Sequence, residues 1–221
     1  MKQAILILIL LFSIPALAQE RYLMPKDEAA RDKSFAPFRS KLIDAVKRRD
    51  AKFILSILDA DIKNSFGGND GIEEFKEYWQ IESANSKFWG EFLPVIGNGG
   101  HFQAEGEGGL PIFTAPYSFT GFPDDLDAFE HSVIFGSRVN LRKAPNLTSP
   151  IVGKLSYNIV RVTNTIPLSD DAESPDWYEI ETLGRLRGFV KAEYVRSPID
   201  YRAGFQKKSG VWKMIFFIAG D

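Results

Sequence analysis

Five side chains are the natural candidates for acid–base or metal chemistry in this chain. They are His101 and His131, the only two histidines, with the neighbouring carboxylates Asp124, Asp125 and Glu130. The chain has no cysteine, which excludes a thiol nucleophile, a disulfide and a thiolate metal site. The histidines do not form the HExxH pair of a zinc hydrolase, and adjacent aspartates in a Pro-Asp-Asp turn are usually solvated. We therefore predict no enzyme, no metal and no cofactor; a metal site joining a histidine to these carboxylates is the alternative.

A second set of side chains is suited to binding rather than catalysis. Exposed aromatic rings can stack on sugars or hold a peptide at a low cost in side-chain entropy. The candidates in the C-terminal half are Tyr157, Trp177, Tyr178 and Phe189. Trp177 and Phe189 also occupy alternating strand positions that are typical of a core, so burial is the competing interpretation for these two.

A further candidate pocket combines residues from distant parts of the chain. Trp79, Trp89, Tyr201 and Arg202 would line its mouth if the C-terminus packs on the N-terminal helices. Arg202 would be the natural contact for an anion. Core packing of the tryptophans and a surface ion pair for the arginine are the alternative.

Short apolar segments position the first group of aromatic residues. They follow one another at the spacing of short strands, at 139–142, 153–155, 176–180, 188–190 and 194–195. This order resembles a bacterial Src-homology-3-like domain. The resemblance implies a small β-barrel over 133–198 that binds peptides or cell-wall material, or acts as a spacer.

Helical periodicity dominates the N-terminal half. Phe35, Phe38, Leu42 and Val46 recur at three- and four-residue steps and predict a helix within 27–49. Asp50 can cap a second helix at 51–58. A short strand at 62–66 and further helices after residue 71 and at 86–96 follow. The segment 112–117 reads as an edge strand because Pro116 cannot donate to a ladder.

The C-terminal segment 199–221 predicts a β-hairpin, with a turn at 207–210. An isolated hairpin is marginal in water, so we expect it to pack on the N-terminal domain, 19–132. The predicted fold class is α+β: N-terminal helices on a sheet completed by the C-terminal hairpin, plus the small barrel. With the segments 45–50, 66–68 and 210–221, this arrangement also resembles a nuclear-transport-factor-2-like cone.

The first 18 residues have the features of a secretory signal peptide. Lys2 precedes an apolar run at 4–14 and a small-x-small site ending at Ala18, and the run is too short to span a membrane. We expect cleavage there, a periplasmic or secreted protein, and no stable membrane insertion afterwards. Loss of Lys2 leaves 26 basic against 29 acidic residues, a net charge of −3. That balance argues against nucleic acid as a partner.

These expectations favour a binding module over an enzyme. The predicted partners are a peptide, peptidoglycan or an envelope protein held by the aromatic residues of the barrel. The alternative is a small-molecule-binding or catalytic cone-type domain that the barrel positions. An enclosed apolar pocket with a convergent acid–base pair among the N-terminal helices would favour that alternative.

Overall fold

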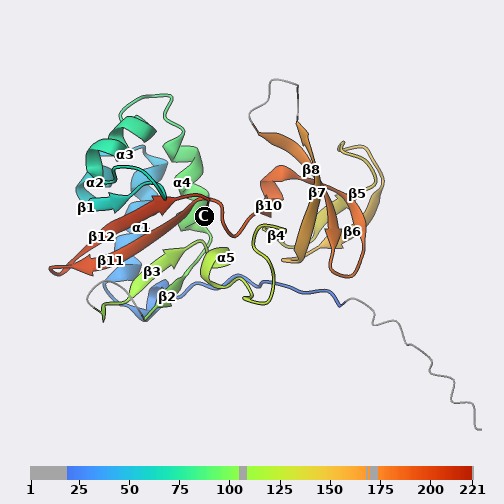
Figure 1. The fold of residues 1–221 in the computed structure, drawn as a ribbon, viewed down its shortest axis with the longest axis horizontal. Coiled ribbons are helices and arrows are strands. Elements are labelled where there is room, and N and C mark those ends of the chain that lie inside the picture. The colour runs from blue at the N-terminus through green and yellow to red at the C-terminus, as the bar shows by residue number, and fades with distance from the viewer. Residues whose placement is uncertain (1–18, 105–108, 168, 170–173, 221) are drawn as a thin grey trace, which may run out of the picture.

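A computed structural model describes residues 19–104, 109–167, 169 and 174–220. Within these residues the chain forms five α-helices and two β-sheets, so the α+β prediction is confirmed. The two sheets lie in separate lobes, and the helices gather around the first (Figure 1). The predicted signal peptide, residues 1–18, lies outside the described residues.

The first sheet has five strands in the order β1-β12-β11-β3-β2. They are β1 (Leu58–Lys63), β2 (His101–Gln103), β3 (Ile112–Ala115), β11 (Arg202–Lys208) and β12 (Val211–Ile218). The C-terminal strands form the predicted hairpin, whose turn residues Ser209 and Gly210 both have positive φ, 48° and 82°. This hairpin joins β1 on one side to β3 on the other and completes the N-terminal sheet.

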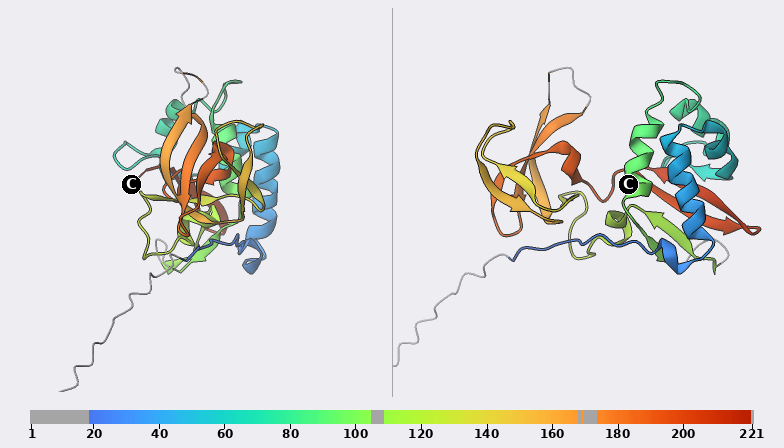
Figure 2. Two further views of the ribbon diagram at one scale, coloured as in Figure 1. Left: turned by 90° about the vertical axis from the view of Figure 1, so that its right-hand side faces the viewer. Right: turned by 180° about the vertical axis from the view of Figure 1, so that it is seen from behind.

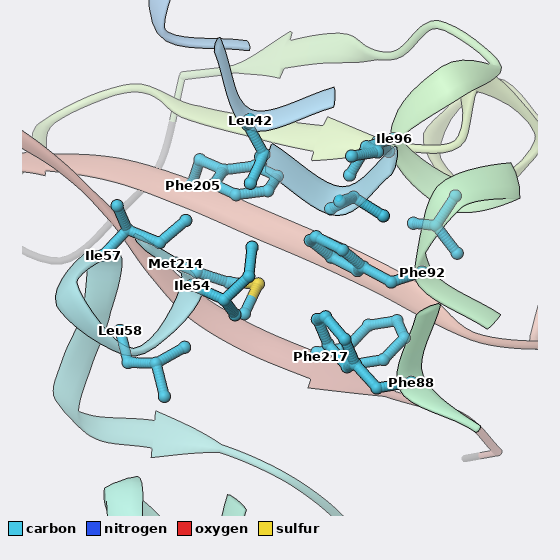
Figure 3. Packing of buried hydrophobic residues seen from close by; sticks show 14 of the residues in the cluster. Leu42, Ile54, Ile57, Leu58, Phe88, Phe92, Ile96, Phe205, Met214 and Phe217 are labelled. Carbon is cyan, nitrogen blue, oxygen red and sulfur yellow. The ribbon is translucent and has the colours of Figure 1, made fainter. Parts of the chain in front are cut away.

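Four helices form the core with this sheet: α1 (Phe35–Lys47), α2 (Ala51–Ile57), α3 (Gly71–Trp79) and α4 (Phe88–Gly97). The view from behind shows α1 and α4 crossing the sheet (Figure 2). Asp50 caps α2 as predicted, because its carboxylate accepts a hydrogen bond of 3.0 Å from Phe53 N. Buried apolar side chains of the helices meet Phe205, Met214 and Phe217 of the hairpin (Figure 3).

The strand β3 differs from its prediction. Residues 112–117 were expected at a sheet edge, yet β3 pairs with β11 on one side and β2 on the other. The prediction is wrong because the strand ends at Ala115, so that Pro116 does not take part in the ladder. Pro116 instead precedes the short helix α5 (Tyr117–Thr120).

The second sheet has seven strands in the order β10-β4-β7-β8-β9-β5-β6. They are β4 (His131–Ile134), β5 (Val139–Arg142), β6 (Ile151–Leu155), β7 (Ile159–Pro167), β8 (Pro175–Thr182), β9 (Arg187–Lys191) and β10 (Val195–Arg196). The sheet curls into a half-barrel around a small apolar core that includes Leu141, Ile180 and Val190. It begins at His131, two residues before the expected domain start.

The N-terminal segment connects the two lobes. Arg21 O accepts a hydrogen bond of 2.9 Å from Ile159 N, and Leu23 N donates one of 2.8 Å to Tyr157 O. A few residues later, Lys26 O accepts from Gly100 N at 3.0 Å in the first lobe. Residues 19–23 therefore lie on the second sheet, although we expected them to belong to the N-terminal domain, 19–132.

Candidate ligand-binding site

The pairing of β8 with β9 decides which aromatic side chains face outward. Trp177 pairs with Lys191 and Glu179 pairs with Phe189, so these four share one face of the sheet. Tyr178 pairs with Val190, which is fully buried in the apolar core of the curled sheet. Trp177 and Phe189 thus lie on the outer face, and Tyr178 lies on the inner one.

A cavity of about 330 Å³ opens on this outer face beside Trp177. Its walls come from β5, the turn after β5, β8 and the end of β9. The lining residues are Ser137, Arg138, Val139, Asn140, Arg142, Leu147, Trp177, Lys191, Glu193 and Tyr194. The volume lies at the lower end of the range of small-ligand sites.

Trp177 forms the apolar floor of this cavity. The residue is only 4% exposed, so the burial interpretation is correct for Trp177, and Lys191 Nζ lies 5.2 Å from its ring centroid. The same ammonium donates a hydrogen bond of 2.5 Å to Asp176 Oδ1. The cation–π contact and the ion pair together hold Lys191 over the indole ring.

The walls of the cavity carry an excess of positive charge. Arg138, Arg142 and Lys191 face one lining carboxylate, Glu193. Arg142 Nη1 donates to Ser149 O at 2.8 Å, which fixes the guanidinium at the cavity wall. Arg138 is exposed, and its side chain forms no ion pair with any described residue. An apolar floor beside three cations favours a ligand that combines an apolar portion with a carboxylate.

The other predicted barrel residues lie elsewhere. Tyr157 is half-buried at a turn, where it has a φ of 58° and its backbone carbonyl binds the N-terminal segment. Tyr178 lines a different cavity, which also includes Glu91 and Asp200, and burial raises the pKa of its phenol. Phe189 is half-buried opposite Arg142 without lining the Trp177 cavity. Of the four predicted residues, only Trp177 therefore contributes to this cavity.

The second predicted pocket is brought together in part. The Trp79 and Tyr201 rings lie 5.2 Å apart, and both residues line a cavity of about 460 Å³. Trp89 is buried against Phe88, with ring centroids 5.2 Å apart, and lies outside that cavity. The core alternative is the correct interpretation for Trp89.

Arg202 does not contact this cavity, contrary to the prediction. Its guanidinium carbon lies 4.9 Å from the Phe119 ring centroid and 5.3 Å from that of Phe66. The residue is 4% exposed, so it is no surface anion contact. The physical reason is strand geometry, since consecutive residues such as Tyr201 and Arg202 point to opposite faces where a strand begins.

Three of the five candidates for acid–base chemistry, Asp125, Glu130 and His131, have polar partners in the structure. Asp125 forms two hydrogen bonds with Arg21, of 2.6 and 2.9 Å. His131 Nδ1 lies 2.9 Å from Asp127 O. In the described part of the chain, no group of three or more His, Cys, Asp and Glu side chains could hold a metal ion.

Sequence reasoning missed Arg138, Asn140, Leu147, Lys191 and Tyr194 as members of the site. The signal for Lys191 is present in the sequence, because residues 188–191 alternate and place Lys191 on the face of Phe189. Leu147 and Arg138 lie in turns, and their approach to Trp177 depends on the β5–β6 and β5–β9 pairings.

Comparison with known proteins adds no relative from which a function could be transferred. No protein-family model matches the sequence, and the search of curated proteins gives no significant match.

No helix among the described residues is long and apolar enough to cross a membrane.

Proposed function

We propose that this protein is an exported, non-enzymatic binding module whose curled sheet is a bacterial Src-homology-3-like domain. Its ligand is a peptide bearing a free carboxylate, held in the cavity beside Trp177. Such a peptide is available in the peptide stems of peptidoglycan and in chain ends of envelope proteins. Export to the periplasm is part of the proposal and rests on the sequence of residues 1–18.

The observation that carries the proposal is the position of Lys191 above the Trp177 ring, with Arg138 and Arg142 beside it. A peptide side chain or methyl group would pack on Leu147, which is 67% exposed, and on the small exposed part of the indole, and the carboxylate would accept hydrogen bonds from the guanidinium groups. Arg142 is suited to this task because one of its nitrogens is anchored on Ser149 O while others have no partner among the described residues.

The assignment of a Src-homology-3-like domain has two supports. The first is the spacing of the short strand segments in the sequence. The second is the curled sheet around a small core, in which β7 and β8 form a long hairpin and β9 returns to β5. The fold alone does not specify a ligand, so the functional proposal rests on the cavity.

Sedimentation with purified peptidoglycan sacculi tests the proposal. Residues 19–221 should co-sediment with intact sacculi, and at least tenfold more weakly with sacculi whose peptide stems have been removed by an amidase. The variants Arg138→Ala and Lys191→Met should each weaken binding about tenfold or more, because each removes a positive charge from the wall of the cavity that holds the carboxylate. Circular dichroism checks that both variants fold.

Two controls separate this site from other surfaces. Lys154→Ala removes an exposed cation of β6 outside the cavity and should leave binding unchanged. The double variant Tyr157→Ala/Tyr178→Ala tests the barrel residues predicted from the sequence. Binding that survives Arg138→Ala and Lys191→Met but is lost in the tyrosine variant would move the site to the inner face. If stripped sacculi bind as well as intact ones, the ligand is not the stem peptide.

A further inference from the structure

The first lobe carries a groove that the proposed function does not use. Two cavities, of about 460 and 280 Å³, lie on either side of Tyr78 and Tyr201 and share these two residues as lining. We call the pair of cavities the tyrosine groove. It lies where α3, the start of α4, the residues after β1 and the segment before β11 meet. Together the cavities have the volume of a site for a ligand larger than a single small metabolite.

Tyr78 presents a fixed aromatic ring at the centre of the groove. The residue is 62% exposed, which is unusual for a large aromatic side chain held by its neighbours. Its ring meets that of Trp79 edge to face, with centroids 4.9 Å apart, and its hydroxyl lies 2.9 Å from that of Tyr201. Tyr201 is itself packed against Phe217, with centroids 4.9 Å apart. These contacts hold the ring in place before a ligand arrives.

Each half of the groove also contains a buried polar atom that lacks a partner. Trp79 lines the larger cavity, is 5% exposed, and its indole Nε1 donates to no described residue. Asn64 lines the smaller cavity; its Nδ2 donates to Gly71 O and Glu74 Oε2, and its Oδ1 has no partner in the described part of the chain. Unpaired buried polar atoms are costly, and both atoms lie in residues that line the groove. A ligand that enters the groove with a small shift of the lining side chains would supply the missing acceptor and donor.

The rim of the groove is polar and mostly neutral. The larger cavity is lined by Gln80, Ser83, Asn85 and Ser86, with one cation and one carboxylate, Lys87 and Glu91; Ser65 lines the smaller one. Glu74 does not offer a free carboxylate, since it accepts hydrogen bonds from Asn64 Nδ2 and from the backbone of Asn69 and Asp70. Lys87 is the only cation among the described residues that line the two cavities, and the carboxylate of Glu91 balances its charge. The groove is therefore unsuited to a phosphate or a multiply charged peptide.

From these features we infer that the tyrosine groove binds an oligosaccharide. A sugar ring has an apolar face that packs on an aromatic ring and a rim of hydroxyl groups that both donate and accept. Tyr78 would stack on one ring, Trp79 Nε1 would donate to a hydroxyl or acetamido oxygen, and Asn64 Oδ1 would accept from a neighbouring unit. This site is independent of the Trp177 cavity, which lies in the other lobe.

Calorimetric titration of residues 19–221 with three soluble trisaccharides tests the inference. The probes are tri-N-acetylchitotriose, cellotriose and maltotriose, which differ in linkage and in their acetamido groups. We expect binding of at least one trisaccharide, accompanied by a change in tryptophan fluorescence. Absence of binding of all three, at the highest concentration that solubility allows, would overturn the inference.

Matched variants distinguish the groove from nonspecific contact. Tyr78→Ala removes an exposed ring and should weaken binding about tenfold or more, whereas Phe129→Ala removes a ring that is 70% exposed outside the groove and should leave it unchanged. Trp79→Phe keeps an aromatic core residue but deletes the Nε1 donor. It should weaken binding of the trisaccharide that has the highest affinity, and it should leave unchanged the part of the binding to sacculi that the Lys191→Met variant abolishes. Equal loss in Tyr78→Ala and Phe129→Ala would overturn the assignment.

Discussion

The carboxylate of Glu20 accepts a hydrogen bond from the hydroxyl of Thr182, 162 residues later in the chain. Its other oxygen accepts from Asn158 Nδ2 at 3.3 Å. Thr182 and Asn158 are buried, at 1% and 5% exposure, so this carboxylate satisfies polar groups that water does not reach. The residues directly after the expected cleavage point are thus part of the second lobe.

Replacement of Glu20 should therefore destabilise the second lobe. We expect Glu20→Ala to lower the free energy of unfolding by about 1–3 kcal/mol, because it leaves buried donors without an acceptor. Urea unfolding followed by tryptophan fluorescence measures the change. Glu77→Ala, at an exposed glutamate of α3, is the control and should stay within about 0.5 kcal/mol of the parent. In a double-mutant cycle with Thr182→Val, additive effects would contradict the proposed contact.

Arg39 should be equally important for the first lobe. It is 9% exposed, and its Nε and Nη2 donate to Ile96 O at 2.9 and 2.7 Å, while Nη1 pairs with Asp27. We expect Arg39→Met to cost about 2–3 kcal/mol, because it unpairs a helix-end carbonyl. Arg39→Lys keeps the charge but cannot present two parallel donors, so it should recover only part of the loss. Chemical denaturation measures the free energy of unfolding of both variants. A value for Arg39→Lys equal to that of the parent would show that the positive charge alone is sufficient.

Glu28 makes the first lobe sensitive to acid. A hydrogen bond from Lys26, and then one from the Phe102 backbone N–H, lower the pKa of this carboxyl from 4.5 to about 2. Because the folded-state pKa is the lower one, the stabilisation is fully present above about pH 4.5 and is lost as the pH falls toward 2. Glu28→Gln should reduce stability at neutral pH and flatten the decline in acid. A variant whose stability falls as steeply as the parent's between those pH values would exclude Glu28 as the group responsible.

The elements that depend on local pattern could be predicted from the sequence. The apolar spacing from Phe35 to Val46 falls within α1, and Asp50 caps α2 as its side chain suggests. The C-terminal hairpin was also recognisable, because a Gly210 turn separates two apolar segments. In each case the signal lies within a few residues of the element that it specifies.

The features that depend on register could not be predicted in the same way. A shift of one residue in register moves a side chain to the other face of a sheet. The sequence of β8 is compatible with either Trp177 or Tyr178 facing the core. The pairing of β8 with β9, together with the burial of Ile180 and Val190, decides it. For the same reason Arg202 was predicted to line the same pocket as Tyr201, although the side chains of consecutive residues in an extended chain point in opposite directions.

Two glycines should respond in opposite directions to the same substitution. A Cβ at Gly100 would lie 2.2 Å from Thr114 O and 2.7 Å from the Phe113 ring, whereas a Cβ at Gly90 on α4 would meet no atom within 4 Å. We expect Gly100→Ala to destabilise the protein by about 1–3 kcal/mol through overpacking at β2–β3. Gly90→Ala should stabilise it by about 0.5–1 kcal/mol, because alanine loses less conformational entropy in a helix. Thermal unfolding of the two variants measures both effects, and a loss of stability in Gly90→Ala would show that this face of α4 is covered.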